Sequence, residues 1–414
     1  MYYEKRLTAE ENILLELIAN GESESNDLDS DCEIDKVINW NRVYHESKGQ
    51  AVSLLAFDSV KKYEQIIPTD IYEDWFMVAA GVISTNLRIV KAQADLVNLL
   101  VKNGVKYVIL KGCAAAEYYS KPDLRSLGDV DVLIDKKDLQ RVSKLLSENE
   151  YDRHKEENEC HVVFEKQGVN FEIHFEISGV PYGVVGDKVR EYMIDLIASA
   201  RLVLGEFGEY AVPQPEHHAV ILLLHMQHHM LGEGMGLRHL YDWGRFVKVT
   251  LNNPFWKEKL IPFLKDIGLF TYAKVMTKTC AIYLNGALPD WANDVPTELC
   301  EDVITDIFKS GNFGRKNKAR AAGGALVSEH GKAGTKHGKV YNAFKFTHRV
   351  VITKYPFVKK VFILYPFLYV YKIVRYLTLR LFGKRPSLTE TVAAANERKA
   401  VYDKLHVFEI ENER

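Results

Sequence analysis

Cysteine is scarce in this sequence of 414 residues, and its few copies form no metal or disulfide pattern. The five cysteines are Cys32, Cys113, Cys160, Cys280 and Cys300. No two of them stand in a Cys-x-x-Cys spacing, which argues against a disulfide scaffold or a zinc ribbon and favours a reducing compartment, the cytoplasm. The first residues, MYYEKR, lack the apolar stretch of a secretory signal. No uninterrupted apolar window of about 18 residues occurs, so we expect no transmembrane helix.

Acidic residues are almost missing from one long segment. Residues 311–385 contain 17 Lys and Arg but only one acid, Glu329, whereas residues 1–100 contain 18 Asp and Glu against 9 Lys and Arg. The net charge of −2 hides this asymmetry. A basic segment of this kind indicates an anionic partner, such as a phosphate-rich ligand, nucleic acid or a membrane surface. The alternative is that it packs against the acidic N-terminal part.

The hydrophobic pattern divides the chain into five parts. They are a helical N-terminal region (1–104), an α/β core (105–186), a helical domain (187–310), a loop rich in glycine and lysine (311–340), and a basic, aromatic, helical C-terminal region (341–414). In the first part we expect helices at 7–19, about 37–65 and 84–103, with an acidic, Ser-rich loop at 21–35. The fold class predicted for the whole is α+β.

Strand and helix signals alternate between residues 105 and 176. Strands are expected at 105–110, 129–134, 161–166 and 169–175, and helices at 113–119 and 136–148. The last two strands are separated only by Gln167 and Gly168, which predicts a tight hairpin turn.

Two aspartates lie on one face of the second strand. Side chains alternate along a strand, so Asp129 and Asp131 point one way while Val130 points the other. By the same parity Glu172 and His174 share a face of a later strand. Three carboxylates on neighbouring strands would hold Mg²⁺, whose preferred ligands are oxygens, and would serve a two-metal phosphoryl or nucleotidyl transfer. The alternative is that Asp129 merely begins the strand and Asp131 is exposed.

A phosphate site is indicated just upstream. The strand around Val108 runs through Lys111 and Gly112 into the start of a helix, where backbone N–H groups can approach an anion closely. Arg125 lies four residues before Asp129 and is suited to neutralise phosphate charge. An ordinary strand-to-helix turn and a surface salt bridge are the respective alternatives.

These segments together resemble a known family. Leu110-Lys111-Gly112, the run LRSLGDVDVLI at 124–134 and FEIHF at 171–175 are similar to the uncharacterised bacterial nucleotidyltransferase family of the polymerase-β-like superfamily. The segment 236–242, with Arg238 and Asp242, resembles the helical Arg-x-x-x-Asp element of that family. The resemblance covers about 105–245. One position departs from the pattern, because Cys113 stands where the family has Ser or Gly.

The resemblance implies a minimal nucleotidyltransferase mixed sheet flanked by helices, with residues 187–310 completing the cleft. It implies that Asp129 and Asp131 bind both metal ions and that Glu172 binds one and helps to deprotonate the acceptor. Gly112 and the N–H groups after it would hold the β and γ phosphates, with Lys111 compensating for Cys113. The candidate nucleotide-binding residues are Lys111, Gly112, Cys113, Arg125, His174, Arg238 and Asp242.

The expected activity is transfer of a nucleoside monophosphate from an NTP to a hydroxyl or phosphate acceptor, with Mg²⁺ or alternatively Mn²⁺. Family members are often associated with polysaccharide or other secondary-product loci, which suggests such a role here. A second hypothesis is a catalytically degenerate core that binds a nucleotide or a protein partner. In that case the helical C-terminal region would form the interface.

Three further features leave alternatives open. His225 and His229 are four residues apart on a predicted helix, a spacing that can bind zinc, although packing or a hydrogen bond to substrate also explains it. Arg238 and Asp242 are four residues apart on a predicted helix, a spacing that suits an ion pair between them as well as a role in orienting a base or phosphate. The basic segment 341–385 is suited to peripheral contact with an anionic membrane, or else to a helical bundle broken by Pro356 and Pro366. No RNA-binding module is apparent, so nucleic acid is not expected as a partner.

Overall fold

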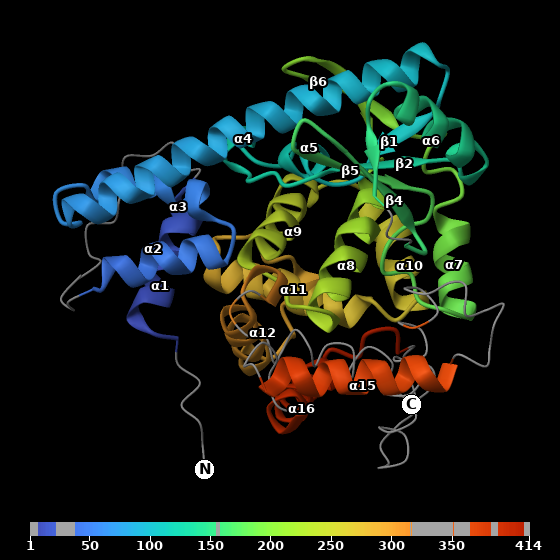
Figure 1. Ribbon diagram of the computed structural model, residues 1–414. Helices are drawn as coiled ribbons and strands as arrows, with labels where there is room; N and C mark the ends of the chain where they lie inside the picture. Colours follow the sequence, from blue (N-terminus) through green and yellow to red (C-terminus); the bar gives the residue numbers. More distant parts are fainter. Residues whose placement is uncertain are drawn as a thin grey trace.

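One mixed β-sheet lies over a body of helices in the computed structural model (Figure 1). The structure describes residues 7–21, 38–154, 158–314, 316, 351, 365–381 and 388–409. The α+β class, with a mixed sheet flanked by helices, is confirmed.

Three short helices form the N-terminal part: α1 (Ala9–Asn20), α2 (Trp40–Gly49) and α3 (Ser53–Val60). α1 begins with a capping box, because the Thr8 hydroxyl accepts from the Glu11 N–H at 3.2 Å while the Thr8 N–H donates to the Glu11 carboxylate at 2.9 Å. The single helix expected at 37–65 is wrong: the chain turns at Ala51, whose φ is +58°, and forms α2 and α3. Residues 22–37, with most of the acidic run, lie outside the described residues.

The long helix α4 (Thr69–Lys102) crosses the whole molecule above the sheet (Figure 1). Its end, at Asn103, is where the sequence predicts it, but its start is much earlier than residue 84. The first half leaves Phe76 and Met77 exposed, by 53% and 67%. These exposed apolar side chains blur the helical periodicity there, which is why the pattern alone does not reveal this half.

The sheet contains β1 (Tyr107–Ile109), β2 (Val130–Ile134), β3 (Asp152–Arg153), β4 (His161–Lys166) and β5 (Val169–His174), in the order β1-β2-β5-β4-β3. β2 and β5 are parallel, and the other pairs are antiparallel. The turn between β4 and β5 is the predicted two-residue turn, with positive φ at both Gln167 and Gly168. Short helices α5 (Cys113–Ala116) and α6 (Leu139–Glu148) follow β1 and β2.

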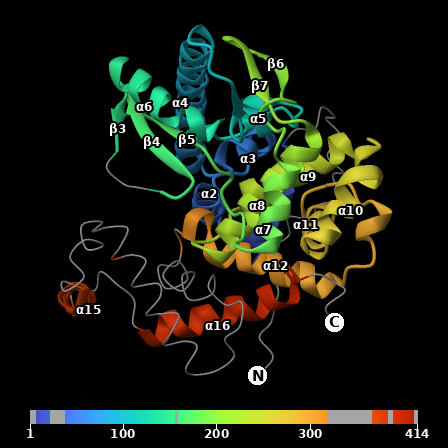
Figure 2. The same cartoon turned by 90° about the vertical axis from the view of Figure 1, so that its right-hand side faces the viewer.

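Each face of the sheet has its own apolar layer. Val130, Val132, Phe171 and Ile173 pack with residues of α4 and α6 in one core. The opposite face turns toward α8 (Pro215–Leu231) and α9 (Leu237–Thr250), where Leu133 joins a second core. α4 and the α8–α9 pair therefore lie on opposite sides of the sheet, as Figure 2 shows from a second direction. Because side chains alternate along β2 and β5, Asp131 and Glu172 point to the face that looks toward α8 and α9, opposite to Val130 and Ile173.

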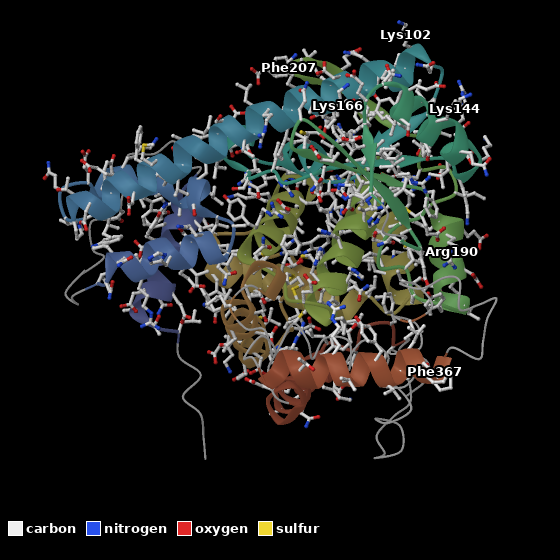
Figure 3. All side chains as sticks on the ribbon, viewed as in Figure 1. Lys102, Lys144, Lys166, Arg190, Phe207 and Phe367 are labelled. Atoms are coloured by element: carbon white, nitrogen blue, oxygen red, sulfur yellow. The ribbon has the colours of Figure 1, made fainter. Side chains whose placement is uncertain are left out.

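A β-hairpin follows α7 (Val184–Tyr192). The sequence pattern beyond residue 187 predicts mostly helix and does not reveal this hairpin. The hairpin consists of β6 (Arg201–Gly205) and β7 (Gly208–Val212). Ala211 and Val212 of β7 join the core beneath α4, whereas Leu202 and Leu204 of β6 are exposed by 64% and 82%. Phe207 lies at the hairpin tip (Figure 3).

The remaining helices are α10 (Ile261–Asp266), α11 (Phe270–Tyr283), α12 (Thr297–Ser310), α15 (Tyr365–Leu381) and α16 (Leu388–Lys404). Single 3₁₀ turns occur at Lys61–Tyr63, Pro122–Leu124, Lys136–Asp138, Asp290–Ala292 and Asn312–Gly314, and a π-helical turn at Trp256–Leu260. Most of the predicted loop at 311–340 lies outside the described residues. Phe367 of α15 is 70% exposed (Figure 3). Among the described helices none is long and apolar enough to span a membrane.

Candidate active site

Three carboxylates meet on the face of the sheet that looks toward α8 and α9. Asp131 of β2 and Glu172 of β5 are direct neighbours in the parallel register, and Asp129 immediately precedes β2. One oxygen from each of the three lies within 4.8 Å of the others. The strand parity expected from the sequence therefore places these side chains together, while Val130 and Ile173 point into the opposite core.

A lysine and a histidine contact this cluster. Lys111 Nζ lies 2.7 Å from Asp131 Oδ1. His174 Nε2 lies 2.9 Å from the same oxygen and 3.2 Å from Glu172 Oε2. Asp131 and His174 are almost completely buried. The Lys111 ammonium and a hydrogen bond from His174 thus compensate the buried Asp131 carboxylate.

The pKa values of these groups follow from burial and mutual charge. Burial opposes ionisation of Asp131, but Lys111 and His174 hold its pKa well below the usual range. Burial likewise opposes the charged forms of Lys111 and His174, yet the carboxylates raise the pKa of both. Burial, and then the charge of Asp131, raise the pKa of Asp129 to about 6. The negative charge of Asp129 is therefore less well compensated by neighbouring cations than that of Asp131.

The turn between β1 and α5 depends on Gly112, which has φ +56° and ψ −113°. A side chain is disfavoured in this conformation, so glycine permits the turn that brings the backbone to the cavity. α5 is only one turn long. Cys113 is buried and is not among the residues that line the cavity, so its predicted contribution to nucleotide binding is through its backbone N–H. Burial raises the pKa of this thiol to about 11.

Arg125 and Asp242 form a buried pair. The Arg125 guanidinium donates to both carboxylate oxygens of Asp242, at 2.8 and 2.7 Å, and the Tyr119 hydroxyl donates to the same carboxylate at 2.7 Å. The pairing of Asp242 with Arg238 is therefore wrong. Asp242 is 3% exposed, and its carboxylate holds the Arg125 guanidinium at the cavity wall.

Arg238 has a different environment. Its Nη1 donates to the Ser126 carbonyl at 2.8 Å, but its buried Nε has no hydrogen-bond partner. Arg238 lines the same cavity as Asp129 and lowers the pKa of that residue in part. Its guanidinium therefore retains donor capacity beside the carboxylates. His174, in contrast, is 1% exposed, and its Nε2 contacts both Asp131 and Glu172. Its contact with a nucleotide stays a prediction.

A cavity of about 380 Å³ opens above these groups. Its walls include Lys111, Gly112, Arg125, Asp129, Asp131, His161, Glu172, His225, His228, His229, Glu233, Arg238 and Phe313. His161 is a site residue that the motifs miss, with its Nε2 3.7 Å from Glu172 Oε1. The hairpin register does point to it, because a two-residue turn at 167–168 pairs His161 with His174.

The donor set suits a hard divalent cation. All three side chains of the carboxylate cluster offer oxygen, the ligand atom that Mg²⁺ and Mn²⁺ prefer. Asp129 and Glu172 border the cavity, so an ion held there has room for oxygens of a bound phosphate. The arrangement is suited to hold a metal–phosphate complex.

Comparison with known proteins gives one family. A family model described as uncharacterised nucleotidyltransferase matches residues 36–285, which is more than half of the chain. The match extends from just before α2 to just beyond α11, and it includes the sheet, α8 and α9. No curated protein matches the chain.

Proposed function

Because the chain belongs to the uncharacterised nucleotidyltransferase family, we propose that it transfers a nucleoside monophosphate from an NTP to a hydroxyl or phosphate acceptor with a divalent metal. The family makes the chain a transferase. The observation that carries the finer proposal is the meeting of Asp129, Asp131 and Glu172 in one cavity with Lys111 and Arg238.

Asp129, Asp131 and Glu172 would hold the metal, which is Mg²⁺ or alternatively Mn²⁺. When bound, such an ion neutralises phosphate charge and activates the acceptor oxygen. Asp129 matters most for entry of the ion, because its pKa of about 6 leaves it ionised at neutral pH without a cation of its own in contact.

The protein's own cations bind and orient the triphosphate. Lys111 lies at the cavity wall, and its ammonium contacts Asp131 while no phosphate is bound. When phosphate oxygens enter, the Lys111 ammonium can turn to them from Asp131, and the Arg238 guanidinium adds positive charge at the cavity wall. Gly112 lets the backbone approach the same oxygens. These contacts fix the phosphates relative to the carboxylates.

Glu172 is suited to take the acceptor proton. Its side chain is 24% exposed toward the cavity, whereas Asp131 is almost completely buried. His174 Nε2 contacts Asp131 Oδ1 at 2.9 Å and lies 3.2 Å from Glu172 Oε2, so the imidazole fixes the two carboxylates relative to each other. We assign His174 as a positioning residue on this basis. A role in polysaccharide or other secondary-product biosynthesis, in the cytoplasm, is part of the proposal. The family resemblance supports the role, and the free thiols of the four cysteines that the structure describes support the compartment.

Nucleotide binding tests the proposal directly. Calorimetric titration of each NTP into the full-length chain, with and without Mg²⁺, should show binding that requires the metal. The Asp129→Asn, Asp131→Asn double variant should lose it, whereas Asp135→Asn should not. Asp135 is a matched control, because it follows the same strand but pairs with Lys137 at the surface. Equal metal and nucleotide affinity in the double variant and the wild type would remove the basis of the proposal.

The degenerate-core hypothesis gives a different result. A core that only senses nucleotide would bind NTP and Mg²⁺ without releasing pyrophosphate in the presence of any acceptor extract. Release of pyrophosphate that depends on Asp131 excludes this second function.

A further inference from the structure

We propose that His225, His229 and His239 form a second metal site, for a transition ion of the zinc class, in the wall of the same cavity. Nothing in the nucleotidyl-transfer proposal requires this site, and it stands on different residues. The sequence places His225 and His229 on one helical face, but the third histidine comes from another helix.

The three imidazole rings converge on one point between α8 and α9. His225 and His229 are one turn apart on α8, and His239 lies in the first turn of α9. The ring centroids are 4.4 Å apart for His225–His229 and 5.1 Å for each of the other two pairs. One ring nitrogen from each residue lies within 4.8 Å of the others. The rings therefore form a nearly equilateral triangle.

The polar atoms of this triangle are poorly satisfied without an ion. His239 is 2% exposed, and neither of its ring nitrogens has a hydrogen-bond partner. The one contact recorded within the triangle joins His225 Nε2 and His229 Nε2 at 2.8 Å. Buried polar atoms normally have partners, and a fully buried imidazole with two unpaired nitrogens is costly. An ion at the centre would give His239 a partner.

The spacing needs only a small adjustment. Zinc binds imidazole nitrogen at about 2.0–2.1 Å, so two nitrogens of a tetrahedral site lie about 3.3 Å apart. The His225–His229 pair is somewhat closer than this, and a side-chain shift of roughly 0.5 Å opens it to the tetrahedral spacing. The i, i+4 spacing on one helix with a third ligand from a neighbouring helix is a common donor arrangement for zinc.

The ligand type separates this site from the carboxylate cluster. Three neutral imidazoles select Zn²⁺, Co²⁺ or Ni²⁺, whereas Mg²⁺ prefers oxygen. Lys111 and Arg238 disfavour positive charge near the three histidines, but Lys111 is paired with Asp131 and Arg238 lies near Asp129, and these carboxylates offset part of the repulsion.

The site has one closed side and one open side. Phe313 packs against His229 and His239, with ring centroids 4.8 and 5.7 Å away. His225 and His229 line the cavity that also contains the carboxylates. A fourth coordination position on that side would take water or an anionic oxygen of the bound substrate, as in zinc sites with three protein ligands.

Metal analysis of the full-length chain tests the proposal. The chain is produced without a polyhistidine tag, stripped with a chelator and dialysed against Zn²⁺ or Co²⁺ in excess Mg²⁺. We expect one Zn²⁺ per chain by mass spectrometry, and an intense visible Co²⁺ spectrum typical of four-coordinate nitrogen and oxygen ligation. Less than half an equivalent of Zn²⁺, or binding that excess Mg²⁺ abolishes, would overturn the proposal.

Variants identify the ligands. His239→Gln and the His225→Gln, His229→Gln double variant should each weaken Zn²⁺ binding by more than about 100-fold, since loss of even an outer partner costs about 10–100-fold. His228→Gln is the matched control, because His228 is exposed on the same helix and lies outside the triangle. It should retain Zn²⁺, and so should Asp129→Asn. Equal Zn²⁺ loss in His228→Gln refutes the assignment.

A second measurement covers the case in which His239→Gln does not fold. X-ray absorption of the Zn²⁺-loaded wild type should show three imidazole nitrogens and no sulfur in the first shell. Fewer than two imidazoles, or any sulfur ligand, overturns the proposal without a variant. Loss of NTP binding with Zn²⁺ binding intact would count against the proposed function alone.

Discussion

Lys111 holds Asp131 in a buried ion pair that must give way when a metal binds the same oxygen. The Nζ–Oδ1 distance is 2.7 Å, with the Lys111 side chain 14% and the Asp131 side chain 3% exposed. Replacing Lys111 by Met keeps the length of the side chain and removes its charge. The change has opposite expected effects on folding and on metal affinity, which makes it a sharp test.

The magnitude follows from the buried pair. Removing one partner of such a pair costs about 3–5 kcal/mol, because the remaining charge stays buried without compensation. His174 still contacts Asp131 at 2.9 Å, so the lower end of that range, about 3 kcal/mol, applies to Lys111→Met. At roughly 2 °C per kcal/mol for a chain of this size, the melting temperature without metal should fall by about 6 °C.

Magnesium should reverse most of this loss. An ion at 100 times its Kd stabilises the folded state by about 2.7 kcal/mol. In Lys111→Met it no longer competes with an ammonium for Asp131, so its Kd should fall and the melting temperature should rise more than in the wild type. NTP affinity should decrease, because a phosphate-binding cation is missing.

Differential scanning fluorimetry without Mg²⁺ and with Mg²⁺ at about 100 times its Kd measures both effects. Lys137→Met is the control, since Lys137 pairs with Asp135 while remaining 76% exposed, and little change is expected. The reasoning is refuted if Lys111→Met has the same melting temperature as the wild type in the absence of metal. It is also refuted if its Mg²⁺-induced shift is no larger than that of the wild type.

Three further outcomes are expected. Asp242→Asn should destabilise the fold by about 3 kcal/mol in urea titrations, because it leaves the buried Arg125 charge uncompensated; a loss below about 1 kcal/mol contradicts this. Gly112→Ala should cost about 1–3 kcal/mol through its positive φ alone, since a Cβ would meet nothing closer than 3.7 Å, and an unchanged melting temperature would exclude that strain. Burial lowers the pKa of His218 to about 3 in the folded protein. The contribution of the neutral His218 to the free energy of unfolding is therefore fully present above the unfolded-state pKa of about 6.5. Below that pH it declines by about 1.4 kcal/mol per pH unit, because the unfolded chain binds a proton that the folded chain does not. A melting-temperature scan from pH 7 to 5 should therefore be less steep in His218→Phe than in the wild type, and parallel curves would disprove the assignment.

Several site residues follow from local rules that act over a few positions. The alternation of a strand separates Asp129 and Asp131 from Val130, and the structure confirms that Val130 enters the core. The two-residue turn at Gln167–Gly168 fixes the β4–β5 register and, with it, the position of His161 opposite His174. In contrast, the β6–β7 hairpin lacks such a signal, because its glycines, Gly205 and Gly208, flank the turn rather than occupy its centre.

Local periodicity thus determined which face of each strand carries the acids, where the hairpin turns and where α4 ends, since these depend only on neighbouring dihedral angles and side-chain parity. Tertiary packing alone decided that β5 lies parallel beside β2, which brings Glu172 next to Asp131. It also decided that Arg125 pairs with Asp242 and that His239 of α9 lies beside His225 and His229 of α8. These pairings join residues far apart in the chain, and their free energy comes from shared burial, which no local pattern of residues encodes.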